Sequence, residues 1–119
     1  MHKLKDLKVY QKALKFTKTV RRTSKKFPKD ELFVLTAQFK RAGDSIALNI
    51  AEGAGNTSNK EFARFLGYSI RSGFECIGCA DIALENEFID KTSYDEVLSS
   101  VNEIIAMLDG LQKSINKKS

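Results

Sequence analysis

The stretch SIALNIAEGAGNTSNKEF, residues 45–62, decides how the chain is read, because polar residues and a Gly-x-Gly interrupt an apolar run there. A nucleotide-binding glycine loop follows a strand, or carries a Lys-Ser/Thr pair after its glycines, and neither condition is met. The alternative is the junction of two helices. Gly53 or Gly55 in a positive-φ conformation would end the first helix, and Ser58 with Glu61 forms a capping box that would begin the second.

Outward from this junction, apolar residues recur at three- and four-residue steps, as they do on one face of a helix. The pattern predicts four helices, at about residues 6–26, 30–52, 59–87 and 91–113. Pro28 disfavours a helical residue before it and ends the first helix. Asp30 is the expected N-cap of the second helix, and Asp90 or Ser93 that of the fourth. Short loops between helices of this length predict a single all-α domain over residues 1–119, an antiparallel up-down-up-down four-helix bundle.

Composition agrees with a globular helical protein. The 119 residues are 42% hydrophobic and 29% charged, with one proline and no tryptophan. No apolar run approaches ~18 residues, so we expect no membrane span. The first residues lack the apolar core of a secretory signal, and we therefore expect a cytoplasmic protein.

The predicted third helix is unusually rich in small residues, among them Gly67, Ser69, Gly73, Gly78 and Ala80. A glycine inside a helix costs up to ~1 kcal/mol relative to alanine, so close contacts should compensate for it. Those contacts indicate self-association through the second or third helix, or else the glycines are merely tolerated.

Charge is divided unevenly along the chain. Residues 1–29 hold eleven Lys/Arg against one Asp, a local balance of +10, whereas the whole chain carries +5. Most of these cations fall opposite the apolar stripe of the first helix. We call the following seven residues the basic arc: Lys5, Lys8, Lys12, Lys15, Lys18, Arg22 and Lys26. Such an arc indicates a polyanionic partner, a complementary acidic protein, or a solvated face with no partner.

No constellation for catalysis is found. The one histidine, His2, lies near the N-terminus, which leaves no base for a nucleophile. Cys76 and Cys79 form one C-x-x-C in mid-helix, but zinc needs two further ligands. We therefore expect no enzyme activity, no metal and no cofactor. The free amides that begin the third helix offer one place for an anion such as an RNA phosphate.

One polar face of the second helix stands out, because its residues follow at steps of four, four and three. It carries Arg41, Ser45, Asn49 and Glu52. Glu75 and Arg71 of the third helix are available partners. Since buried polar groups must be paired, we expect a structural network that fixes the register of two helices or of two subunits.

Four stretches carry a family resemblance: LKVYQKALKF at 7–16, QFKRAGDSIALNIAEG at 38–53, NKEFARFL at 59–66 and SGFEC at 72–76. Through them nearly the whole chain resembles the 23S rRNA intervening-sequence proteins. Two details depart from the family pattern. Asn56 stands where the family usually has arginine, and Arg71 and Gly73 flank Ser72 where glycine and a larger apolar residue are more usual.

This resemblance implies an intracellular bacterial four-helix bundle that assembles with itself, commonly into a ring of five, and has no catalytic activity. Related accessory proteins of diversity-generating retroelements bind nucleic acid and a reverse transcriptase. We therefore expect a non-enzymatic homo-oligomer that binds RNA or DNA through the basic arc. The alternative is an assembly scaffold whose basic arc docks an acidic protein, with no nucleic-acid role.

Overall fold

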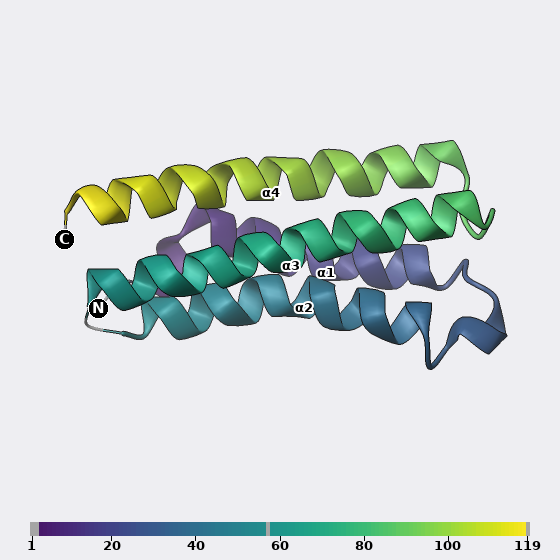
Figure 1. Ribbon diagram of the computed structural model, residues 1–119, viewed down its shortest axis with the longest axis horizontal. Coiled ribbons are helices and arrows are strands. Elements are labelled where there is room, and N and C mark those ends of the chain that lie inside the picture. The colour runs from purple at the N-terminus through teal and green to yellow at the C-terminus, as the bar shows by residue number, and fades with distance from the viewer. Residues whose placement is uncertain (1–2, 57, 119) are drawn as a thin grey trace.

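The computed structural model describes residues 3–56 and 58–118, in which four long helices lie side by side (Figure 1). They are α1 (Lys8–Ser24), α2 (Leu35–Ala54), α3 (Asn59–Glu85) and α4 (Lys91–Lys117), with single 3-10 turns η1 (Leu4–Asp6) and η2 (Lys29–Glu31) on either side of α1. Each helix packs on its two neighbours around the bundle, most extensively α2 on α3 and least extensively α1 on α4. The described residues form no strand, and the predicted antiparallel four-helix bundle is confirmed. His2 lies outside the described residues.

The core is built from the apolar stripes that the sequence pattern identifies. Phe16, Phe39 and Phe62 come from three different helices and are almost completely buried. At one end of the bundle the ring of Phe27 stacks on Phe39 at 5.9 Å and meets Phe88 at 6.0 Å. Aromatic contacts therefore close the end of the bundle at which α1 ends and α2 begins.

The start of α2 differs from the prediction. Asp30 lies inside the 3-10 turn η2, where the amide of Glu31 donates to the carbonyl of Pro28 at 3.0 Å. The four-residue hydrogen-bond ladder of α2 begins only with the amide of Gln38 and the carbonyl of Val34. Val34 is the N-cap residue and its side chain caps nothing, so the prediction of Asp30 as the N-cap is wrong.

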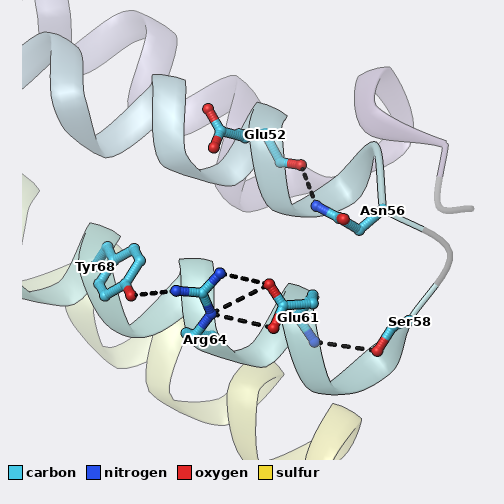
Figure 2. A network of polar contacts seen from close by, with 6 residues as sticks. All are labelled: Glu52, Asn56, Ser58, Glu61, Arg64 and Tyr68. Atoms are coloured by element: carbon cyan, nitrogen blue, oxygen red, sulfur yellow. Dashed lines mark hydrogen bonds and ion pairs between the residues drawn. The ribbon is translucent and has the colours of Figure 1, made fainter.

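The turn between α2 and α3 is also built differently. No described glycine has a positive φ, and Gly55 ends α2 with a φ of −75°. Gly53 serves packing instead, because a Cβ there would lie 2.8 Å from the Cβ of Phe65. Asn56 donates its side-chain amide to the carbonyl of Glu52 at 3.0 Å and so satisfies a helix-end carbonyl (Figure 2). The predicted positive-φ glycine is therefore wrong.

The helix starts that rest on side-chain caps are as predicted. The hydroxyl of Ser58 accepts the amide of Glu61 at 3.3 Å at the start of α3, as drawn in Figure 2. Asp90 accepts the amide of Ser93 at 2.9 Å at the start of α4. That bond lowers the pKa of Asp90, and it decides between the two N-cap candidates in favour of Asp90.

The small residues of α3 find their contacts largely inside the bundle. A Cβ on Gly73 would lie 2.8 Å from Cγ1 of Ile105 on α4, so the backbones of α3 and α4 approach closely there. The hydroxyl of Ser69 donates to the carbonyl of Ile46 on α2 at 2.9 Å. Gly78 differs from these two, because a Cβ there would meet nothing within 4 Å.

The end of α3 stores backbone strain. Glu87 has a φ of 61° and is the only non-glycine residue of the described chain with a positive φ. The amide of Phe88 donates back to the carbonyl of Ala83 at 2.8 Å, which is the long bond of a Schellman motif. This position favours glycine, and an L-residue there costs roughly 1–2 kcal/mol.

Replacing Glu87 by glycine should therefore raise the free energy of unfolding by about 1 kcal/mol, measured by urea denaturation. Glu87→Ala removes the same charge but keeps the Cβ, and it is the matched control that should give no comparable gain. Equal stabilisation by glycine and alanine would contradict the backbone explanation.

Candidate nucleic-acid interface

The basic arc lies on the solvent side of α1 and its flanking turns. The opposite side of α1 buries Val9, Ala13, Phe16 and Val20 against the other helices. Of the seven arc residues only Lys12 is half-buried, and the other six are exposed. The arc is thus the outer face of the bundle's first helix, α1, which runs behind α3 in the view of Figure 1.

Three residues of the arc are already engaged by α4. Lys12 pairs with Glu103 at 3.1 Å, and Arg22 pairs with Glu96 at 2.7 Å. Lys26 donates to the hydroxyl of Ser93 at 2.5 Å.

The remaining four arc residues have no such partner. The ammonium groups of Lys5, Lys8, Lys15 and Lys18 form no ion pair or hydrogen bond with a described residue, and we call these four the unpaired lysines. An unpaired ammonium keeps its full charge available for an external anion. These four lysines therefore carry the available charge of the arc, and one of them, Lys15, lies beside α4 without pairing with it.

On the side of α1 that faces α2, Arg21 forms an ion pair between the two helices. Arg21 donates twice to the carboxylate of Asp44 on α2, at 2.7 and 2.9 Å. These bonds raise the pKa of Arg21 above its usual value. Because the pair is bidentate, it fixes the orientation of α1 on α2 more tightly than a single contact would.

The predicted polar face of α2 is only partly brought together. Asn49 donates to both the hydroxyl and the carbonyl of Ser45 at 2.9 Å, and the hydroxyl of Ser72 on α3 donates to that of Ser45 at 2.9 Å. These three residues link α2 to α3 within one chain. Arg41 and Glu52 are exposed, and neither side chain is hydrogen-bonded to another described residue.

The two predicted partners on α3 have other neighbours. Glu75 is exposed and accepts a hydrogen bond from the side-chain amide of Gln38 on α2 at 2.7 Å. The guanidinium of Arg71 lies 5.7 Å from the ring centre of Tyr68. Neither contacts Asn49 or Ser45 by a hydrogen bond, so the linked set is Ser45, Asn49 and Ser72.

A cationic and aromatic cluster that the sequence patterns did not single out lies at the start of α3. Arg64 donates to the carboxylate of Glu61 and to the hydroxyl of Tyr68 (Figure 2). Its guanidinium also lies 5.1 Å from the ring centre of Phe65. Arg64 lowers the pKa of Glu61. Since Ser58 already accepts the amide of Glu61 and this first turn is acidic, the start of α3 is poorly suited to an anion.

The described residues contain no group of three His, Cys, Asp or Glu side chains placed to hold a metal ion. Cys76 and Cys79 are buried free thiols. Burial raises the pKa of both, that of Cys79 to about 11, so they stay protonated at neutral pH. Within the described chain, no helix is long and apolar enough to cross a membrane.

Comparison with known proteins agrees with this architecture. The family described as 23S rRNA-intervening sequence protein matches residues 5–110. The chain belongs to the 23S rRNA-intervening sequence protein family. No curated protein matches the sequence.

A crystal structure of a protein of unknown function from the S23 ribosomal protein family of Bacteroides thetaiotaomicron has the same fold. It superposes with a TM-score of 0.82 at 24% identity, over 88% of this family member and 95% of that chain. At this identity the likeness establishes the fold alone.

The carboxylates that engage the basic arc were missed by sequence reasoning. Glu96 and Glu103 lie seven residues apart on one face of α4, but their partners are 74 and 91 residues away in the chain. Only the packing of α4 beside α1 reveals which cations they engage.

Proposed function

We propose that this member of the 23S rRNA-intervening sequence protein family is a non-enzymatic, homo-oligomeric cytoplasmic bundle that binds nucleic acid through the basic arc. The observation that carries the proposal is the row of unpaired lysines on the outer face of α1 and η1. Ion pairs with carboxylates engage two other cations of the arc, Lys12 and Arg22, whereas these four lysines have no such pair with a described residue.

The spacing of the unpaired lysines suits a phosphate backbone. Lys8 and Lys18 are ten residues apart on α1, which is about 15 Å along a helix axis. Duplex DNA carries one negative charge per ~1.7 Å of its axis, so each ammonium can reach a phosphate without a fixed register. Because such contacts carry no sequence information, the expected binding is directed by charge and shape.

A second candidate is an assembly scaffold that docks an acidic protein. It is favoured by the pairing of Lys12 and Arg22 with Glu103 and Glu96, which shows that α1 accommodates carboxylates on a neighbouring helix. Exposed pairs of this kind each contribute only ~0–1 kcal/mol, so several would be needed for a stable complex. Binding to nucleic acid separates the two candidates.

Neutralising three unpaired lysines, in Lys8→Gln with Lys15→Gln and Lys18→Gln, should weaken binding to a short duplex. At about 50 mM monovalent salt the dissociation constant should rise roughly tenfold for each lysine, because each contact releases condensed counterions. Fluorescence anisotropy with two labelled duplexes of unrelated sequence measures the effect, which should be equal for both.

The matched control is Lys12→Gln with Arg22→Gln, since both side chains are held by carboxylates of α4. It should weaken binding less for each charge removed. Absence of any binding by the unmodified protein to RNA and DNA at low salt would rule out the nucleic-acid role and leave the scaffold.

Self-association is the second part of the proposal, and exposed apolar side chains on the outer face of α2 and α3 support it. Phe74 and Ile82 on α3 are 59% and 50% exposed, and Val34 at the start of α2 is 64% exposed. Val34 and Ile82, with Gly78, line a largely apolar groove of about 390 Å³ between α2 and α3. Contiguous apolar surface of this kind marks an interaction site, and a second copy covers it in the proposed assembly.

Phe74→Ser with Ile82→Ser should therefore dissociate the assembly, while Leu14→Ser, at an exposed leucine of α1, should not. Sedimentation velocity measures the mass. The ring of five that the family resemblance implies corresponds to about 67 kDa, five times the 13.3 kDa of one chain. A 13.3 kDa species for the unmodified protein at micromolar concentration would contradict self-association.

A further inference from the structure

A recess opens where the end of α1, the η2 turn and the first turns of α2 meet. These three segments lie at the right-hand end of the bundle in Figure 1. Its volume is about 370 Å³, within the range of roughly 300–1,000 Å³ usual for small-molecule sites. Lys15 and Lys18 do not line it, so it is distinct from the row of unpaired lysines.

Three lysines from three different segments line this recess. Lys25 follows α1, Lys29 begins η2, and Lys40 lies in the second turn of α2. None of them forms an ion pair or side-chain hydrogen bond with a described residue, and no acidic residue lines the recess. Three lysines without an ionic partner beside one concave site favour an anion of charge about −2, such as a phosphate monoester.

The rest of the wall is mostly apolar. It is formed by Phe27, Pro28 and Leu32. Phe27 is fixed by stacking on Phe39, whereas Leu32 is half exposed. A bare phosphate would leave this apolar surface in water, so the ligand that fits has an apolar part beside its anionic group.

Thr36 brings a hydroxyl to the recess. It lines the recess, the residue is only 6% exposed, and its hydroxyl makes no hydrogen bond with a described residue. No buried side-chain polar atom of the described residues lacks a partner, so this hydroxyl still reaches solvent and is free to donate to a ligand. Thr36 is the second residue of α2, and no side chain caps the start of this helix, where the helix dipole also favours an anion.

We propose that this recess binds a nucleoside 5′-phosphate, with the phosphate held by Lys25, Lys29 and Lys40 and the base or sugar against Pro28 and Leu32. The hydroxyl of Thr36 donates to a phosphate oxygen. The same chemistry is presented by a free nucleotide and by the 5′-terminal nucleotide of a strand. The recess is short and open, which does not suit a long acyl chain.

Isothermal titration calorimetry of the full chain tests the assignment, with uridine 5′-monophosphate, uridine and inorganic phosphate as the three probes. The monophosphate should bind at least tenfold more tightly than either of the others. Equal affinity for inorganic phosphate, or no heat from the monophosphate at millimolar concentration, would overturn the proposal.

Variants locate the site. Each of Lys25→Gln, Lys29→Gln and Lys40→Gln should weaken monophosphate binding by about tenfold, the effect of one lost charge-assisted hydrogen bond. Thr36→Val is close in shape and removes only the hydroxyl, so it should weaken binding several-fold while the circular dichroism melting curve stays unchanged. Unchanged affinity in the triple lysine variant would overturn the assignment.

Two comparisons separate this site from the polyanion face. The Lys8→Gln, Lys15→Gln, Lys18→Gln protein should bind the monophosphate with unmodified affinity, so failure of the arc proposal leaves this result intact. A trinucleotide with a 5′-phosphate is then compared with the same trinucleotide ending in a 5′-hydroxyl. Preference for the phosphorylated strand assigns the recess to strand ends, and binding of the free monophosphate alone assigns it to free nucleotides.

Discussion

The close packing of α2 against α3 is the constraint on which the rest of the bundle depends. A fully buried hydroxyl, that of Ser69, donates across the interface to the carbonyl of Ile46, and Gly53 leaves room for the side chains of Phe62 and Phe65. A shift in the register of α2 against α3 would leave the buried hydroxyl of Ser69 without a partner, at a cost of about 1–3 kcal/mol. It would also replace Gly53 by a residue whose Cβ collides with the side chains of Phe62 and Phe65. The α2–α3 pair is therefore the central contact of the bundle, and α1 and α4 pack against it.

The charge distribution follows from that arrangement. α1 packs on α2 and α4 packs on α3, and the two outer helices meet each other only along a thin seam. Ion pairs from Lys12 to Glu103 and from Arg22 to Glu96 cross this seam. Because both ion pairs are exposed, they add little to the stability of the fold. They do neutralise two cations of the basic arc, Lys12 and Arg22. The fold thus engages three of the seven cations of the arc with α4 and leaves four unpaired, and the four unpaired lysines remain free to act on a partner.

Local sequence signals predicted the fold because helix periodicity and side-chain caps are local properties. Ser58 marks the start of α3 for this reason, since its partner amide is three residues away. Features that depend on remote packing were not predictable: Asp30 falls in a 3-10 turn, and Gly53 is required by aromatic side chains of another helix rather than by its own φ. The site divides in the same way. The basic arc was predictable because it lies on one helix. Its pairing with Glu96 and Glu103 was not predictable, because these carboxylates lie on α4. The recess that includes Lys40 was not predictable either, because three separate segments of the chain form it.

The most direct test of the central claim is the salt dependence of binding to a duplex of about 10 base pairs, which matches the roughly 30 Å length of one arc. If the four unpaired lysines alone release counterions, log K should fall against log salt concentration with a slope of about −3.6, four times −0.9. A slope near −6.3, the value of about seven released counterions, would show that the α4 carboxylates do not divide the arc. A flat line would contradict binding through the arc altogether.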